Sequence, residues 1–206
     1  MRLLVATRSE GKQREVRRLL VDAGLEIVFP DDVNLWETSA EDALELHDSF
    51  HANARVKAEY FCRQTGYPTV ADDSGLEVFS LGGEPGVRSR RWAGAVGRDA
   101  DLDAANNAYL LRRLLGAAEL RRRARYRCLL VLLRAANALP ETYEGTCGGT
   151  ITTEPRGRNG FGYDPLFFSD ELGKTFGEAG DEEKDQVSHR GRAFRALRDA
   201  LATHPL

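Results

Sequence analysis

The run of apolar residues at positions 129–133 is the feature of this sequence that most constrains its fold. It lies within residues 126–133, the strongest strand candidate in the chain. An unbroken apolar run of this length suits a strand covered on both faces, as in sheets that carry helices on each side. Residues 3–6 also predict a buried strand, and apolar residues at helical spacing follow Gly11. Strands that alternate with helices in this way predict an α/β fold.

The composition is that of a globular chain, and we expect one domain over residues 1–206. Hydrophobic residues make up 42% and charged residues 30%, which predicts a packed core under a solvated surface. The formal net charge of −3 gives no overall field that would hold a nucleic-acid polymer. No stretch is long enough to span a membrane, and the run at 3–6 is too short for a signal peptide. Three widely spaced cysteines fit reduced thiols, so we expect a cytoplasmic protein.

Further elements follow from periodicity and from capping and turn residues. We expect helices over residues 49–63, 101–115 and 188–202, a short strand over 69–71, an extended segment over 76–81 and a β-hairpin or meander over 143–153. The arginine-rich residues 120–125 are expected to form a solvated linker or helix end.

The polar turn at residues 7–12 is a candidate phosphate site. Thr7 and Ser9 bring hydroxyl donors, Lys12 brings a cation, and the start of a helix directs free backbone amides toward one point. The spacing of a P-loop, GxxxxGK[ST], is absent. An ordinary turn with a surface lysine accounts for the same residues, so this segment alone decides nothing.

The helix that begins near residue 49 places Asn53 and Lys57 on one face, four residues apart. A lysine on a helix is usually solvated, so this pair is weak on its own. Four acidic residues precede the helix and could bind a metal ion or simply complement the helix dipole. They are Glu41, Asp42, Glu45 and Asp48.

The acidic pair Asp72-Asp73 follows the predicted strand at 69–71 directly. Carboxylates at the C-terminal end of a buried strand lie where α/β folds place their sites. Mg²⁺ relieves the repulsion between neighbouring carboxylates, and one carboxylate could accept a proton from an attacking water. An Asx-turn made by Asp73-Ser74-Gly75 explains the same residues equally well.

Two later segments carry polar and aromatic side chains. Residues 156–165 hold several glycines, two aromatic residues and Asp164 before a proline. Glycines allow close approach to a flat ligand and aromatic rings can stack on it, although a rigid turn is the alternative. Lys184 and residues 188–191 add donors near the start of the last helix, where a histidine such as His189 is usually structural.

Together these segments resemble the family of inosine/xanthosine triphosphate diphosphatases (Ham1-like), which hydrolyse non-standard purine nucleoside triphosphates. The matching segments occur in family order and span almost the whole chain. They are residues 7–12 with Arg14-Glu15, Ser49-Phe50, Asn53-Ala54, Lys57-Ala58, residues 71–76, residues 81–87 with Ser89 and Arg90, residues 154–157, residues 160–165, residues 182–184 and residues 188–191.

The resemblance implies a reaction and a role for each matching residue. Water would attack the nucleotide, giving a nucleoside monophosphate and pyrophosphate, with Asp73 as proton acceptor and Mg²⁺ ligand. The implied fold is an elongated mixed β-sheet flanked by helices, with two lobes around a central cleft, in a homodimer. The implied substrate-binding residues are Thr7, Arg8, Ser9, Glu10, Gly11, Lys12, Asn53, Lys57, Ser74, Phe161, Gly162, Tyr163, Asp164, Lys184, His189 and Arg190.

The expected preference for dITP, ITP and XTP can be explained by hydrogen bonding to the base. Donors from His189, Arg190 or the backbone would pair with a 6-oxo group and not with the amine of adenine. The sequence also departs from the family pattern. Ser9 stands where asparagine is usual, and Ala52 stands where glutamate is usual. A longer stretch before residue 49 makes Glu45, rather than Glu41, our choice of second metal ligand.

Three other interpretations fit parts of the sequence. A Maf-like nucleotide pyrophosphatase would cleave the same bond with different motifs. A haloacid-dehalogenase-type phosphatase would need Asp-x-Asp, whereas Asp72 and Asp73 are adjacent. A nucleotide-binding module without hydrolysis would not require a carboxylate such as Asp73 beside a polyanion.

Overall fold

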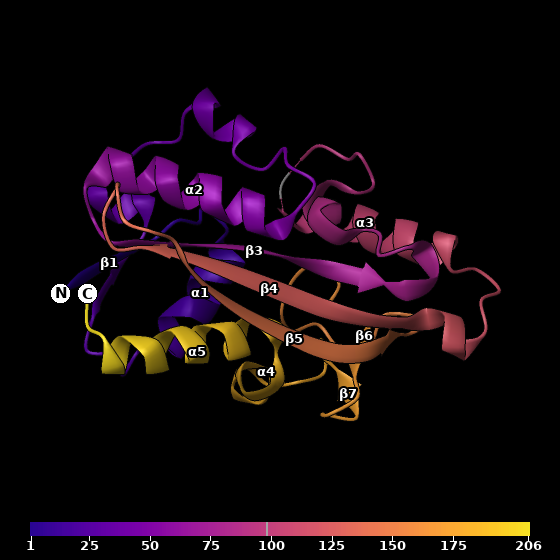
Figure 1. The fold of residues 1–206 in the computed structure, drawn as a ribbon. Coiled ribbons are helices and arrows are strands. Elements are labelled where there is room, and N and C mark those ends of the chain that lie inside the picture. Colours follow the sequence, from indigo (N-terminus) through magenta and orange to yellow (C-terminus); the bar gives the residue numbers. More distant parts are fainter. Residues whose placement is uncertain (98) are drawn as a thin grey trace. The chain divides into compact units, whose positions relative to one another are not determined.

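The computed structural model describes residues 1–97 and 99–206 (Figure 1). The chain divides into two compact units. Unit 1 comprises Met1–Asp73, Cys128–Gly145 and Gly191–Leu206, and unit 2 comprises Ser74–Arg127 and Thr146–Arg190. The predicted arrangement of two lobes around a cleft stays a prediction, as does the single domain.

The strands form one mixed sheet, which confirms the predicted α/β class. Among the described residues the sheet has seven strands in the order β2-β1-β3-β4-β5-β6-β7. β1 pairs in parallel with β2 and β3, whereas β6 pairs antiparallel with β5 and β7. The strands are β1 (Arg2–Val5), β2 (Glu26–Val28), β3 (Thr69–Val78), β4 (Arg123–Leu133), β5 (Glu141–Ile151), β6 (Phe167–Ser169) and β7 (Lys174–Thr175).

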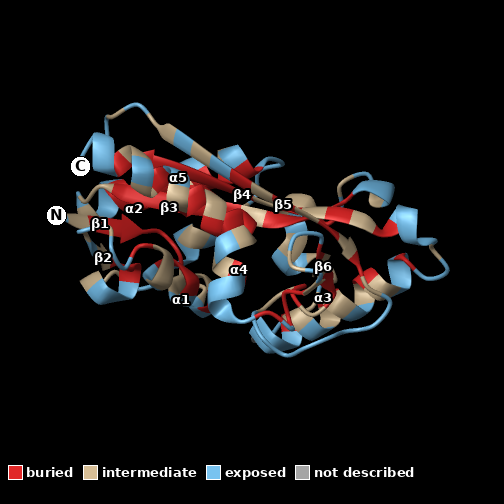
Figure 2. Ribbon diagram, turned by 90° about the horizontal axis from the view of Figure 1, so that it is seen from below, coloured by how far each residue is buried: buried red, intermediate tan, exposed pale blue. Residues whose placement is uncertain are grey.

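The helices of unit 1 cover both faces of its strands. α2 (Phe50–Thr65) and α5 (His189–Thr203) lie on opposite faces in Figure 1. Side chains of α1 (Glu10–Leu19) and α5 share one core with β1, β3 and β4, which includes Val16, Leu130 and Phe194. Both faces of β4 are therefore covered, as the apolar run at 129–133 predicts, and Figure 2 shows β3 and β4 largely buried.

Unit 2 has its own core, built by α3 (Asp99–Arg113) and the aromatic residues of β4 and β6. The Tyr126 ring packs edge-on against Phe167, with centroids 4.7 Å apart, and Phe167 contacts Phe176 at 5.1 Å. A short helix, α4 (Asp181–Val187), precedes α5. Among the described residues, no helix combines the length and apolarity needed to cross a membrane.

Three expectations about the strands were wrong. The extended segment expected over residues 76–81 ends at Val78, because Phe79–Leu81 form a 3-10 helix. β3 runs without a break from Thr69 to Val78, so Asp72 and Asp73 lie within the strand and not at its end. Their carboxylates meet lysine and asparagine side chains from elsewhere in the chain, and this lets a strand continue through two buried acids. Residues 143–153 form no hairpin among themselves, because most of them belong to the single strand β5.

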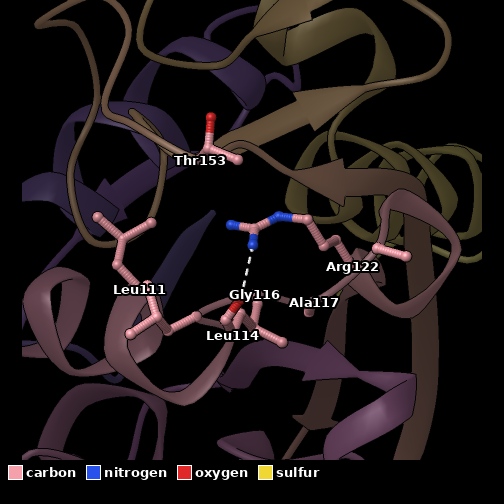
Figure 3. Close-up of a pocket in the computed structure, with 8 residues that line it drawn as sticks. Leu111, Leu114, Gly116, Ala117, Arg122 and Thr153 are labelled. Carbon is pink, nitrogen blue, oxygen red and sulfur yellow. Dashed lines mark hydrogen bonds between the residues drawn. The ribbon is translucent and has the colours of Figure 1, made fainter.

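The expectation of a solvated linker or helix end at residues 120–125 was wrong for residues 123–125, which belong to β4, and for Arg122. This side chain is buried, and its guanidinium donates to the carbonyl oxygens of Leu114 (2.9 Å), Ile151 (2.6 Å) and Thr152 (2.5 Å). It lines a small pocket between Leu111 and Thr153 (Figure 3). Arg122 thus satisfies carbonyl groups just after α3 and at the end of β5, as a cation near a helix C-terminus can.

We expect Arg122→Met to lower the free energy of unfolding by about 3 kcal/mol or more, because three carbonyl groups lose a buried donor. The neighbouring Arg121 is exposed, so Arg121→Met should change stability by no more than about 0.5 kcal/mol. Urea unfolding of both variants measures the difference. Equal stabilities would show that these hydrogen bonds contribute little.

Candidate active site

The turn between β1 and α1 is organised by its own hydroxyl groups. Ser9 is the N-cap of α1, and its hydroxyl accepts from the backbone N–H of Lys12 at 3.5 Å. The Ser9 N–H donates in turn to the Thr7 hydroxyl at 3.3 Å. The amides at the start of α1 and the Lys12 ammonium are thereby brought to one end of the helix, an arrangement that favours an anion.

Lys12 also reaches the acidic pair on β3. Its ammonium lies 3.0 Å from the Asp72 carboxylate, and sixty residues of sequence separate the two. Asp72 is buried, so the ion pair offsets part of the cost of removing a charge from water. The turn at residues 7–12 and the acidic pair therefore belong to one group of side chains within unit 1.

Asp73 is a buried carboxylate held from the side by α2. Asn53 donates to its Oδ2 at 2.9 Å, and Lys57 lies 3.9 Å from its Oδ1. Burial raises the pKa of Asp73, although the charges of Lys57 and Lys12 and the Asn53 hydrogen bond oppose that rise. A carboxylate with a raised pKa is a better proton acceptor than an ordinary aspartate.

Lys57 connects Asp73 to the segment before α2. Its ammonium donates to Glu45 at 2.6 Å and to the backbone oxygen of Asp72 at 2.6 Å. Burial lowers the pKa of Lys57, but the carboxylates of Glu45, Asp73 and Asp72 outweigh it and raise the pKa above its usual value. Lys57 is thus a buried, charged lysine rather than the solvated one that a helix surface would suggest.

The two candidate second ligands, Glu45 and Glu41, have different surroundings. Glu45 and Asp73 both lie close to the Lys57 ammonium. Glu41 is held by Arg8 through two hydrogen bonds of 2.7 and 2.8 Å, and Arg8 also contacts Asp31. The guanidinium of Arg8 is therefore engaged by acidic groups of unit 1 itself.

The donors around Asp73 fit a magnesium ion that takes few protein ligands. Among residues 1–97 and 99–206, no three histidine, cysteine, aspartate or glutamate side chains form a ready metal cluster. Mg²⁺ usually binds through one or two carboxylates, with waters and substrate phosphates completing its shell. Asp73 and Glu45, which both lie close to Lys57, carry hard carboxylate oxygens of the kind that Mg²⁺ binds.

Unit 2 holds the other predicted site residues, gathered around the loop at residues 160–164. The Asp164 carboxylate accepts from the Phe161 N–H at 2.9 Å and from the Lys184 ammonium at 2.5 Å. Lys184 also lies 5.0 Å from the centroid of the Phe161 ring. Asp164 therefore holds the Phe161 backbone near the start of the loop, and its buried ion pair with Lys184 places a cation over the Phe161 ring.

The glycines of this region serve contacts within the protein. Gly160 has φ +74°, and a Cβ there would lie 2.0 Å from the Asp164 carboxylate. A Cβ at Gly157 would lie 1.9 Å from the backbone oxygen of Gly177. Glycine is therefore required at these two positions by close contacts within the protein, with the Asp164 carboxylate and the Gly177 backbone.

His189 and Arg190, at the start of α5, face neighbours of their own in unit 2. The His189 ring is stacked on Tyr126, with centroids 4.5 Å apart and an interplanar angle of 6°. Arg190 donates to the Ser74 hydroxyl at 2.7 Å, and its guanidinium lies 5.6 Å from the centroid of Phe161. Ser74 and Phe161 therefore both lie close to Arg190. All three are among the substrate-binding residues that the family resemblance implies.

Sequence reasoning missed the contribution of α3 to this loop. Asp103 accepts from the Gly162 N–H at 2.7 Å, and Asn107 donates to the Gly162 carbonyl at 2.9 Å. Tyr163 donates to the backbone oxygen of Ser89 at 2.9 Å. The sequence does show two polar residues four positions apart on a predicted helix. It does not show their partner, Gly162, which lies more than fifty residues away.

The fold and these residues define a member of the Ham1 family: the model of that family matches residues 3–200, and the chain belongs to it. The match favours the Ham1-like interpretation of the sequence over the Maf-like one.

Relatives and solved structures match over nearly full length. A dITP/XTP pyrophosphatase of Thermus thermophilus is 43% identical over 205 residues, covering 100% of this chain and 94% of the relative. One from Shigella flexneri is 43% identical and covers 97% and 98%. A HAM1 protein from Coxiella burnetii superposes with a TM-score of 0.85 at 33% identity, covering 98% and 99%. A nucleoside-triphosphatase / dITP/XTP pyrophosphatase from Mycobacterium abscessus gives 0.72 at 40% identity, covering both chains fully.

Proposed function

We propose that this chain hydrolyses dITP, ITP and XTP to the nucleoside monophosphate and pyrophosphate, and so clears these nucleotides from the pool. Membership of the Ham1 family and full-length relatives that are dITP/XTP pyrophosphatases support the proposal. The observation that carries it is the surroundings of Asp73, a buried carboxylate of raised pKa fixed by Asn53 and faced by Lys57.

Asp73 is the proposed proton acceptor. A water molecule attacks the α-phosphorus, its proton passes to the Asp73 carboxylate, and the bond from the α-phosphorus to the bridging oxygen breaks. Pyrophosphate leaves with the electron pair of that bond. Lys12 and Lys57 balance the negative charge that phosphates bring beside two buried carboxylates. Asn53 keeps one oxygen of Asp73 occupied, so that the other is directed to the water.

The remaining residues of unit 1 are assigned to phosphate. Thr7, Ser9 and the amides of Glu10, Gly11 and Lys12 form the anion-binding end of α1. Because Arg8 is engaged by Glu41 and Asp31, its proposed part is to hold this turn in place.

Mg²⁺ is the proposed cofactor, held by Asp73 and Glu45. When bound, it would neutralise phosphate charge and lower the pKa of a coordinated water. Glu41 is the weaker candidate, because Arg8 already takes both of its carboxylate oxygens.

The loop at 160–164 with Lys184, His189 and Arg190 is assigned to the purine base. Phe161 offers a ring face, and Gly162 and Tyr163 shape the loop beside Asp164. The donors of His189 and Arg190 suit a 6-oxo group and not an amine, which is the proposed basis of selectivity. We propose further that the chain acts in the cytoplasm as a homodimer.

Incubation with dITP and Mg²⁺, with pyrophosphate and orthophosphate measured separately, tests the proposal. We expect pyrophosphate in equal amount to the monophosphate, and its loss on chelation of the metal by EDTA. Parallel assays with ITP, XTP, GTP and ATP should show ATP as the poorest substrate. Release of orthophosphate alone would refute the bond assignment, and equal turnover of ATP would refute the assigned selectivity.

A further inference from the structure

The backbone on both sides of Gly162 is held by one helix. The Gly162 N–H belongs to the peptide that joins it to Phe161, and this group donates to Asp103 at 2.7 Å. The Gly162 carbonyl belongs to the peptide that joins it to Tyr163, and it accepts from Asn107 at 2.9 Å. Asp103 and Asn107 lie four residues apart on α3, on one face of the helix.

This pair of bonds restrains the loop at Gly162, one of the two glycines within residues 160–164. Its φ is +64°, a left-handed conformation that glycine adopts at no steric cost. The Phe161–Gly162 peptide is also held on its carbonyl side, where the Phe161 oxygen accepts from the Asp164 N–H at 3.3 Å. With one peptide fixed by a carboxylate and the next by an amide, the Phe161 and Tyr163 side chains have defined directions.

The fixed direction matters for Phe161 in particular. Its ring centroid lies 5.0 Å from the Lys184 ammonium and 5.6 Å from the Arg190 guanidinium. A rotation at Gly162 would move this ring away from both cations. The ring and the two cations belong to the set assigned to the purine base, so their mutual placement decides how well a base fits.

The surroundings of the two α3 residues agree with a positioning role. Burial raises the pKa of Asp103, and its hydrogen bond with the Gly162 N–H opposes that rise. The Asn107 Oδ1 is buried without a hydrogen-bond partner among the described residues. The part of the Asn107 side chain that forms a hydrogen bond is therefore its amide N–H, which donates to the Gly162 carbonyl.

We propose that Asp103 and Asn107 are positioning residues that set the base selectivity of the enzyme by clamping Gly162 in the loop at 160–164. The inference rests on the proposed function, because it concerns the base of that substrate. Neither residue needs to touch the nucleotide. Their effect passes through Phe161 and its neighbours.

The test is steady-state pyrophosphate release from dITP and dATP by Asp103→Ala and Asn107→Leu. Each variant is expected to raise the KM for dITP about tenfold, the size of one lost hydrogen bond in a buried site. kcat for dITP should change little, since the chemistry around Asp73 is untouched. The ratio of kcat/KM for dITP to that for dATP should fall.

Two controls separate positioning from general damage. Asp103→Asn keeps an oxygen that can accept from Gly162 and should restore wild-type KM and selectivity. Asp101→Ala removes a carboxylate from an exposed position of the same helix and should also behave as wild type. If Asp103→Ala does not fold, Asp103→Glu, which displaces the carboxylate by one methylene, carries the same expectation.

The outcomes are distinct. Unchanged KM and selectivity in Asp103→Ala and Asn107→Leu overturn the inference, as does an equal loss of kcat for both nucleotides with no change in their ratio. An Asp103→Asn variant as impaired as Asp103→Ala also overturns it. Failure of the proposed function is seen separately, because the wild type would then release no pyrophosphate from dITP.

Discussion

Asp73→Asn is expected to fold like the wild type and to lose nearly all pyrophosphate release from dITP. The amide is isosteric, keeps an oxygen that can accept from Asn53, and removes a buried charge whose ionisation burial already disfavours. It cannot accept a proton from water. Loss of a general base costs about 10²- to 10⁴-fold in rate, and the metal ion would lose a ligand as well.

Assays of kcat with unfolding curves on the same preparations measure this effect. Asp72→Asn is the matched control, since Asp72 is the adjacent buried acid but pairs with Lys12. We expect that variant to act mainly on KM through Lys12. An Asp73→Asn enzyme with wild-type rates would end the assignment of Asp73 as the proton acceptor.

The pH dependence of the wild type gives the same assignment a second measurement. Because only the ionised carboxylate accepts a proton, kcat/KM should fall as the pH drops through the pKa of Asp73. Burial raises that pKa, whereas a bound Mg²⁺ would lower it, so the fall should move to lower pH as the Mg²⁺ concentration is increased.

Lys184→Met should have the largest effect on stability, with a fall of about 3–5 kcal/mol in the free energy of unfolding. Lys184 and Asp164 form a buried ion pair at 2.5 Å, with side chains 4% and 3% exposed. Removing the cation leaves the Asp164 carboxylate in the protein interior without that charge beside it. Activity on dITP should also fall, since Phe161 loses a cation over its ring.

A surface ion pair provides the control for this prediction. Lys174 pairs with Glu183 at 2.7 Å, but these side chains are 34% and 49% exposed. Lys174→Met should therefore cost no more than about 1 kcal/mol. The double variant Asp164→Asn with Lys184→Met should regain part of the stability without regaining activity, because neither charge of this pair is then left without the other. Equal losses for Lys184→Met and Lys174→Met in urea unfolding would contradict the argument.

The order and type of the main elements could be predicted from the sequence, because local patterns encode them. The apolar run at 129–133 indicated a strand covered on both faces, and β4 is such a strand. A helix was predicted over residues 49–63, and Ser49 is the N-cap of α2, where its hydroxyl accepts from the Ala52 N–H. Periodicity and capping depend on residues a few positions apart, so a linear sequence displays them.

The resemblance to a family was also available from the sequence alone, and the family is confirmed. This resemblance alone placed the turn at 7–12, the acidic pair and the loop at 160–165 among the predicted site residues. The roles of the individual residues stay predictions that the experiments above test.

Only the tertiary structure decided which partner each charged residue has. Lys12 with Asp72, Arg122 with three carbonyl groups, and α3 with Gly162 are pairings over eight to sixty residues of sequence. The acidic pair also lies inside β3, whereas the sequence placed it after a short strand, with an Asx-turn as one of two equally good interpretations. The physical reason is common to all of these. A buried polar group is stable only beside a partner, and long-range packing, which no local pattern records, supplies that partner.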